Sequence, residues 1–182
     1  NVGEKIKPAW TFTCEDEVRG SPTLHNDVLF TGALDNNLYA LNAKDGTFLW
    51  KFPTEGGIVS KPLVAGDAVY FGSADGNLYS VITKTGKVNW TYQTGGPIRS
   101  SPRQVESQII IGSDDGYLHA VNLVTGTTTW KVEASGAIRS TPFITQDQII
   151  YGDDNGDICC LDYHGHVRWR YKAKGGILTS PL

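Results

Sequence analysis

The sequence predicts an all-β chain made of repeated four-stranded antiparallel sheets, and three observations support this fold class. Tryptophan recurs about every 40 residues, at Trp10, Trp50, Trp90, Trp130 and Trp169. Each tryptophan is followed twelve positions later by a proline, so the spacing holds in five copies. Within each copy, short apolar runs alternate with glycine-containing turns, which is typical of hairpin-linked strands. A repeat of this length with four strands predicts a β-propeller in which each copy forms one blade.

The first two strands of a blade are read from the proline and from the apolar run that follows it. The first strand is expected over 58–64 in the second copy, 98–105 in the third and 138–144 in the fourth. The second strand is a nearly continuous apolar run, as at 68–71 and 109–111. A run without polar alternation predicts a strand covered on both faces, as between neighbouring blades.

The other two strands are read from two turns and from the tryptophan. Asp-Gly, as at 75–76, supplies the positive φ that a tight hairpin requires, so a third strand is expected at 78–81. A second turn ends in a glycine such as Gly86, and the fourth strand then carries Trp90. Hairpin turns within each copy argue against a parallel solenoid, and no apolar pattern of helical period supports helical repeats.

The copies divide the chain into complete blades and two partial ones. Complete blades are expected over 17–54, 57–94, 97–134 and 137–173, with an extra fourth strand at 9–14 and an extra first strand at 175–182. The two extra strands lack the middle strands of a blade, so they cannot complete one another. We therefore expect residues 1–182 to be one segment of a larger propeller. The alternative is a four-blade unit that pairs with another copy of itself, because open blade edges favour such pairing.

The turn before each tryptophan carries a recognisable motif. The third copy reads AVNLVTGTTTW at 120–130, and the stretches at 40–50 and 80–90 vary on it. This resembles the tryptophan-docking motif of the PQQ-like, or quinoprotein-type, β-propeller repeats: Ala, any residue, Asp or Asn, two of any, Thr-Gly, three of any, Trp. The resemblance extends from about Trp10 to Pro181. It implies that each tryptophan docks against the next blade and that the complete propeller has seven or eight blades.

The stretch 152–169 gathers residue types that could carry chemistry. Cys159 and Cys160 occupy consecutive positions of a predicted strand, so they should point to opposite faces as small buried thiols. The resemblance offers an alternative, a disulfide between adjacent cysteines over a PQQ cofactor, which would demand a strained turn. His164 and His166 flank a turn glycine and are expected to be exposed, because no zinc-ligand spacing surrounds them. The nearby aspartates are explained by hairpin formation, since no calcium-loop pattern accompanies them.

Arginines recur at a position where a binding site is expected. Arg19, Arg99 and Arg139 each stand three residues before the proline of their copy. The first strand of a propeller blade is innermost, so these side chains should lie at the mouth of the central channel, beside acidic hairpin tips. Such a cluster could hold a small anionic ligand or an acidic segment of a partner protein. The alternative is that the arginines pair with the aspartates of the tips.

Composition excludes several classes of function. The formal net charge of −3 gives no reason to expect nucleic-acid binding, and no apolar run is long enough for membrane insertion. We expect a non-catalytic scaffold or sensor module that binds a protein or a small ligand, without catalytic residues, metal or cofactor. The resemblance makes PQQ and calcium conceivable, but no residues here support them. The alternatives are a fragment of a PQQ-dependent dehydrogenase and a homo-oligomer that closes a ring through exposed blade edges. The resemblance favours a periplasmic or extracellular location.

Overall fold

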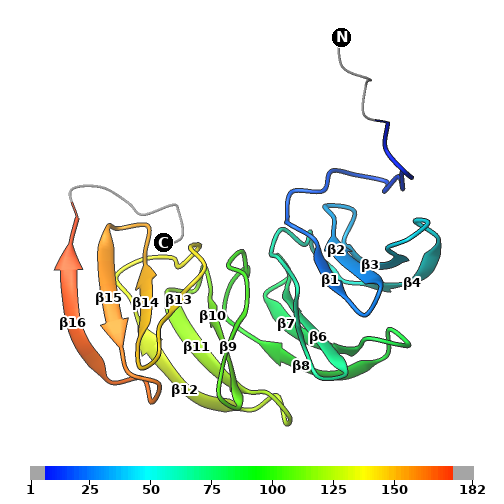
Figure 1. The fold of residues 1–182 in the computed structure, drawn as a ribbon. Helices are drawn as coiled ribbons and strands as arrows, with labels where there is room; N and C mark the ends of the chain where they lie inside the picture. Colours follow the sequence, from blue (N-terminus) through cyan, green and yellow to red (C-terminus); the bar gives the residue numbers. More distant parts are fainter. Residues whose placement is uncertain (1–6, 174–182) are drawn as a thin grey trace, which may run out of the picture.

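The computed structural model describes residues 7–173, which form four four-stranded antiparallel sheets. Each sheet is one blade, and its strands lie in chain order from the first to the fourth. The blades follow one another along an open arc that does not close into a ring (Figure 1). The prediction of an all-β propeller built from four-stranded blades is therefore confirmed. In the part of the chain that the structure describes, no helix could cross a membrane.

The strand bounds repeat closely from blade to blade. Blade 1 contains β1 (Thr23–His25), β2 (Val28–Gly32), β3 (Asn37–Asn42) and β4 (Phe48–Pro53). Blade 2 contains β5 (Leu63–Ala65), β6 (Ala68–Gly72), β7 (Asn77–Ile82) and β8 (Val88–Gln93). Blade 3 contains β9 (Arg103–Val105), β10 (Gln108–Gly112), β11 (Tyr117–Asn122) and β12 (Thr128–Glu133). Blade 4 contains β13 (Phe143–Ile144), β14 (Ile149–Gly152), β15 (Asp157–Leu161) and β16 (Val167–Lys172).

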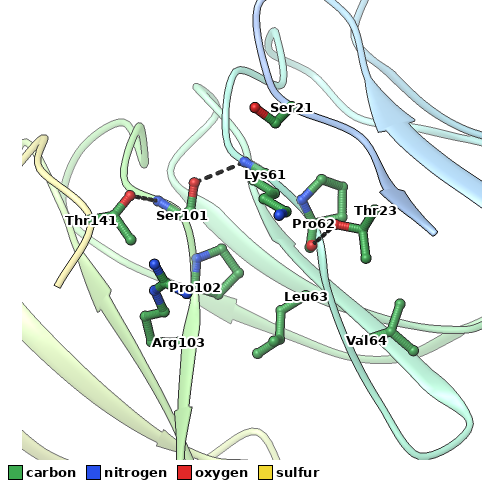
Figure 2. A pocket seen from close by; sticks show the side chains of 10 residues that line it. All are labelled: Ser21, Thr23, Lys61, Pro62, Leu63, Val64, Ser101, Pro102, Arg103 and Thr141. Atoms are coloured by element: carbon green, nitrogen blue, oxygen red, sulfur yellow. Dashed lines mark hydrogen bonds between the residues drawn. The ribbon is translucent and has the colours of Figure 1, made fainter. Parts of the chain in front are cut away.

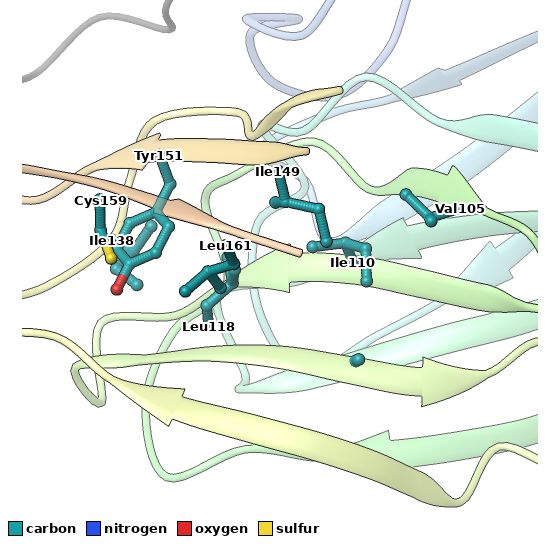
Figure 3. Packing of buried hydrophobic residues seen from close by; sticks show 9 residues of the cluster. Val105, Ile110, Leu118, Ile138, Ile149, Tyr151, Cys159 and Leu161 are labelled. Atoms are coloured by element: carbon teal, nitrogen blue, oxygen red, sulfur yellow. The ribbon is translucent and has the colours of Figure 1, made fainter. Parts of the chain in front are cut away.

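The core consists of layers between neighbouring blades. Every residue of β6 and of β10 is buried, as their unbroken apolar runs predict. Figure 3 shows one such layer, in which Ile110 and Leu118 of blade 3 pack with Tyr151 and Leu161 of blade 4. Because each layer needs side chains from two blades, a blade depends on its neighbour for most of its apolar burial.

The first strands are shorter than the sequence predicts. The predicted strand at 58–64 begins in the structure only at Leu63, after the proline, and its counterparts in blades 3 and 4 begin at the same place. Proline has no N–H to donate to a ladder. The residues before it bond to the preceding blade instead, since the N–H of Ile58 donates to the carbonyl of Ala33 at 3.0 Å. The segment predicted as the start of a strand is thus a connection between blades.

The two extra strands have different outcomes. Residues 9–14 form no strand, so that prediction is wrong, because no strand of the described chain lies beside them to share a ladder. Their side chains nevertheless pack on blade 1, where Trp10 and Phe12 cover Tyr39 and Leu41. The predicted strand at 175–182 lies outside the described residues.

The first strands lie on the inner side of the arc. β1 contacts β5, and β5 contacts β9, although these strands belong to different blades. We call this inner side the channel side of the molecule. Arg19, Arg99 and Arg139 each stand four residues before the first residue of such a strand. They therefore lie next to the channel side.

Candidate functional site

Four tryptophans dock on the following blade in the same way. The indole Nε1 of Trp50 donates to the carbonyl of Thr83 at 2.9 Å, and the indole lies against Gly86. A Cβ at Gly86 would stand 2.8 Å from the ring, and the φ of 69° there favours glycine. We call this carbonyl and glycine together a socket. The same pairing joins Trp10 to Ala43 and Gly46, Trp90 to Leu123 and Gly126, and Trp130 to Tyr163 and Gly165.

The hairpin aspartates hold neighbouring blades together as well as closing their turns. The Oδ1 atom of Asp75 accepts from the N–H of Asn77 at 2.9 Å, which closes the turn. Its Oδ2 atom accepts from the N–H of Glu55 at 3.0 Å, in the connection from the preceding blade. Asp35 and Asp115 make the equivalent bonds. Sequence reasoning assigned these residues to turn formation alone and missed the contact between blades.

An aromatic side chain four residues after each of these aspartates also bonds to its carboxylate. We call the aspartate, its bond to the preceding connection and this aromatic side chain together a latch. The hydroxyls of Tyr39 and Tyr79 donate to Asp35 and Asp75 at 2.6 and 2.8 Å. Burial and the neighbouring carboxylate together raise the pKa of Tyr79 to about 12. The recurrence of Asp with an aromatic residue four positions on, once in each of three copies, is the sequence signal that identifies this latch.

In blade 3 a histidine takes the place of the tyrosine. Nε2 of His119 lies 3.0 Å from Oδ2 of Asp115, and Nδ1 lies 3.0 Å from the hydroxyl of Tyr92. A carboxylate can only accept, so the neutral ring donates from Nε2 and accepts at Nδ1. Burial of His119 lowers its pKa despite the nearby Asp115. For Asp115 the burial alone would raise the pKa, but the bonds from Gly95 and His119 outweigh it and lower the pKa.

This histidine predicts a pH dependence of folding. Because the folded pKa of His119 lies below its ordinary value of 6.5, the unfolded chain binds more protons than the folded one as pH falls below that value. The free energy of unfolding should therefore decrease between pH 7 and pH 5. In His119→Tyr, which copies the sister blades, the decrease should be smaller, as measured by urea unfolding at each pH. An equal decrease in both proteins would contradict this assignment.

Blade 4 replaces the aspartate latch with different residues. Asn155 stands at the aspartate position, and Asp153 instead accepts from the N–H and the hydroxyl of Ser135 at 3.0 and 2.8 Å. Cys159 stands where the sister blades have tyrosine or histidine, and it packs beside the ring of Tyr151 in the layer between blades 3 and 4 (Figure 3). Cys160, the next residue of β15, points to the other face.

The thiols are structural, as the sequence predicts. Cys159 and Cys160 are buried and free, with no disulfide between them. Burial raises the pKa of both thiols, which disfavours the reactive thiolate. The turn that follows is polar and exposed: Nδ1 of His166 lies 3.0 Å from Oδ2 of Asp162. Among residues 7–173, no three His, Cys, Asp or Glu side chains lie together in a way that could hold a metal ion.

The structure brings together two of the three predicted arginines. Arg99 Nε lies 3.1 Å from Asp114 Oδ2, and Arg139 Nε lies 2.9 Å from Asp114 Oδ1. Arg139 also reaches Asp154 at 3.0 Å. Arg19 is separate and pairs with the exposed Glu17 at 2.9 Å. The side chains of Arg99 and Arg139 remain 44% and 43% exposed, so part of each guanidinium still faces solvent.

A groove of about 410 Å³ lies on the channel side, along β1, β5 and β9 (Figure 2). Its wall carries a row of side chains two positions beyond the arginines, and this row consists of Ser21, Lys61, Ser101 and Thr141. The hydroxyls tie neighbouring blades together, since the N–H of Lys61 donates to Ser101 Oγ at 2.9 Å and the N–H of Ser101 donates to Thr141 Oγ1 at 3.2 Å.

Two cations depart from the repeat pattern inside this groove. Lys61 interrupts the row of hydroxyls, and Arg103 stands where the other copies have Thr23, Leu63 or Phe143. Both cations are exposed, and neither forms an ion pair with any of residues 7–173. Sequence reasoning missed them. The signal that could have found them is the departure of Lys61 from an otherwise small, hydroxyl-bearing position.

Comparison with solved structures places the fold among propellers. BamB from Moraxella catarrhalis is 22% identical with a TM-score of 0.83, over 94% of this chain and 54% of that one. The computationally designed Ika8 protein is 15% identical with a TM-score of 0.78, over 87% and 50%. A quinohemoprotein alcohol dehydrogenase from Pseudomonas putida is 18% identical with a TM-score of 0.77, over 90% and 35%. The chain thus spans about half the length of BamB.

A protein-family model extends these likenesses to the sequence. No curated protein matches the chain. The model described as outer membrane protein assembly factor BamB matches residues 7–112 and 114–182, which is nearly the whole chain and includes all five tryptophans. Four of these five tryptophans dock in the sockets described above. The chain therefore belongs to the BamB-like family of PQQ-type propeller repeats.

Proposed function

We propose that this chain is a protein-binding scaffold of an extracytoplasmic compartment, and that its channel side binds an acidic segment of a partner. The observation that carries the proposal is the groove in which Lys61 and Arg103 lie together without a counter-ion from the described residues. The family description, an outer membrane protein assembly factor, supports both the compartment and a role in binding protein.

Cations stand at alternate positions of the segment that leads into the first strand of each blade. Lys61 and Arg103 line the groove. In the repeat, Arg99 stands two positions before the position of Lys61, and Arg103 stands two positions after it. Side chains two residues apart on an extended segment share one side, so these rows follow one another along the wall. The η-nitrogens of Arg99 can donate to a partner carboxylate while its Nε stays paired with Asp114. The η-nitrogens of Arg139 already bond to Asp114 and Asp154. Arg19 offers a third, more exposed guanidinium at this level.

The surroundings of the cations favour a peptide over a small ion. Leu63 and Val64 line the groove beside Lys61, so apolar surface alternates with positive charge. An extended segment with acidic side chains could place carboxylates on the cations and its own apolar atoms on the leucine and valine. The groove is open along the first strands, which suits an extended occupant.

A binding role is also favoured because the Asp, His and Cys side chains that could carry catalysis make structural contacts instead. Asp115 and His119 of blade 3 bond to each other, and they also bond to Gly95 and Tyr92, which precede blade 3 in the chain. Cys159 is buried in the layer between blades 3 and 4. These contacts stabilise blade packing and leave the groups unavailable to a substrate. For the alternative, a dehydrogenase fragment, titration with PQQ and calcium is the direct test, and we expect no change in quinone absorbance.

The groove can be tested with a defined acidic probe. Binding of fluorescein-labelled hexaglutamate, followed by anisotropy at low salt, should weaken about tenfold in the charge-reversal variant Lys61→Glu/Arg103→Glu, which corresponds to about 1.4 kcal/mol. Little stability should be lost, because both side chains are exposed and unpaired within the described chain. Affinity should also fall as salt is raised, since the contacts are between exposed charges.

The matched control is Lys84→Glu/Lys87→Glu, which reverses two exposed charges in the outer turn of blade 2. This variant has the same net charge as the groove variant, so any difference reports position. Equal weakening in both variants would contradict the groove and would indicate only general attraction. Arg99→Ala/Arg139→Ala tests the mouth separately, and unchanged affinity there would remove the mouth from the binding surface.

A further inference from the structure

A hollow of about 720 Å³ lies between blades 2 and 3. Its lining comes from the turn between β5 and β6, from the strands β6 to β8, and from the turn between β11 and β12. It shares no residue with the groove on the channel side. These elements lie in the middle of the chain, so both walls of the hollow belong to complete blades. The hollow is therefore a second surface, distinct from the one to which the acidic segment is assigned.

A row of side chains crosses blade 2 on the face that packs on blade 3. Tyr70 stands opposite Ser80, and Ser80 stands opposite Trp90, so these three side chains share that face. The rows of the other described blades have an aliphatic or phenyl side chain and a small one before the tryptophan: Phe30, Ala40 and Trp50; Ile110, Ala120 and Trp130; Ile150, Cys160 and Trp169. Of the four described blades, only blade 2 has hydroxyls at these two positions.

A bulge in β8 adds a third polar group to the same wall. Asn89 is the extra residue of this bulge, opposite Ser80. The other copies have different side chains there, namely Leu49, Thr129 and Arg168. Nδ2 of Asn89 donates to Ser80 Oγ at 3.3 Å, while its Oδ1 atom accepts from no donor within the described chain. The hydroxyl of Tyr70 donates to the carbonyl of Leu123 at 3.2 Å. The buried hydroxyls thus hold the wall in place, and the amide of Asn89 keeps an acceptor for a ligand.

Among the described residues that line the hollow, Asp67 alone carries a charge. The equivalent aspartates of blades 1 and 4 form ion pairs, Asp27 with Lys44 and Asp147 with Arg168. Asp67 forms none with any of residues 7–173. Lys84 lines an adjacent hollow that Asp67 also lines, and its charge disfavours a cationic ligand at this site. The carboxylate of Asp67 is therefore suited to accept hydrogen bonds from a neutral ligand.

Apolar side chains stand beside these polar groups on both blades. Trp90 of blade 2 lines the hollow and is partly exposed. Val124 of blade 3 also lines it and is 74% exposed. At the position of Val124 the other copies have polar side chains, namely Lys44, Lys84 and His164. The hollow thus combines exposed apolar surface with neutral and acidic hydrogen-bonding groups.

We propose that this hollow binds a neutral mono- or disaccharide. A pyranose ring has an apolar face of C–H groups, which suits Trp90 and Val124, and a rim of hydroxyls that both donate and accept. The carboxylate of Asp67 can only accept and the amide of Asn89 can do both, so together they match the hydroxyls of such a ring. The volume lies within the range of small-ligand sites, about 300 to 1,000 Å³. This binding goes beyond the proposed function and does not depend on it.

The experiment is a titration of the ¹⁵N-labelled 182-residue chain with maltose, cellobiose, lactose and N,N′-diacetylchitobiose, followed by NMR. These sugars differ in linkage, in the orientation of one hydroxyl and in acetylation. With at least one of them, the indole N–H signal of Trp90 should shift in a saturable way, with a Kd on the order of 1 mM. The signals of Trp50 and Trp130, whose rows lack the hydroxyls, should not shift. Asn89→Leu, which copies blade 1, should weaken binding about tenfold, the scale of one or two hydrogen bonds.

The matched control is Thr129→Leu, because Thr129 is the exposed bulge residue of blade 3, and binding should not change in this variant. The absence of a saturable shift with every one of these sugars would overturn the proposal, and so would binding that Asn89→Leu leaves intact. An equal response to sorbitol, an open-chain polyol, would also overturn it, since no ring would then be recognised. Circular dichroism shows whether each variant is folded. Asp67→Ala, at an exposed carboxylate, tests the same site if Asn89→Leu does not fold, and an unchanged affinity there would contradict the site.

Discussion

Replacing Trp90 with alanine should lower the free energy of unfolding by about 3 kcal/mol, the scale typical of a large aromatic side chain removed from a packed layer. The indole donates to the carbonyl of Leu123 at 3.2 Å and packs in the layer between blades 2 and 3, where its ring lies 5.7 Å from that of Tyr70. Its loss leaves a cavity over Gly126 and removes a donor. Urea unfolding followed by circular dichroism measures the change.

Trp169→Ala is the matched control for this prediction. The residue type, the position in the repeat and the strand are the same, but no following blade of the described chain covers Trp169. The loss should be below about 1 kcal/mol, as for an exposed position. Equal losses in Trp90→Ala and Trp169→Ala would mean that the socket contributes nothing beyond the blade itself.

Gly112→Ala should cost about 3 kcal/mol, at the upper end of the range for overpacked cores. Gly112 ends β10 in a fully buried position, and a Cβ there would stand 2.2 Å from Cγ2 of Ile138 in the connection to blade 4. The backbone cannot move away easily, because the hydroxyl of Ser100 bonds to both the N–H and the carbonyl of Gly112 at 2.8 and 2.9 Å. The substitution therefore forces blades 3 and 4 apart.

A second change tests whether the steric contact is the cause. Ile138→Leu removes the β-branch that carries Cγ2, so it should recover about 1 kcal/mol when it is combined with Gly112→Ala. Recovery should be partial, since Cβ of Ile138 lies 2.7 Å from the added atom. Ile138→Leu alone should be destabilising, because it disturbs a packed layer. Strictly additive effects in the double variant would contradict a contact between the two residues.

Much of the fold could be predicted because the sequence pattern of each strand and turn recurs in several copies of the repeat. The tryptophan spacing and the unbroken apolar runs located the second, third and fourth strands, and the structure confirms a four-stranded antiparallel blade in each copy. The first strands were overestimated because apolar residues such as Ile58 indicate burial, and burial does not distinguish a strand from a connection. Residues 9–14 carry strand-like side chains, but a strand also needs a neighbour, which sequence pattern does not supply.

The candidate site was predicted less well, for a physical reason. The arginines could be placed at the channel side from the fold alone, but whether Arg99 and Arg139 meet depends on Asp114, whose side chain bridges them. Lys61 and Arg103 belong to different blades and different positions of the repeat, so only the three-dimensional arrangement brings them into one groove. Departures from a repeat, such as Lys61 among hydroxyls, point to such sites more directly than the residue types that recur in each copy.

Hydrogen–deuterium exchange of the chain with and without hexaglutamate shows directly whether the channel side is the binding surface of this scaffold. We expect slower exchange at the inner strands and the connections before them, around 59–65 and 99–105, because the peptide lies over Lys61 and Arg103. Exchange at the outer strands β8 and β12 should not change. Protection confined to the outer strands, or no protection at all in the presence of saturating peptide, would contradict the claim.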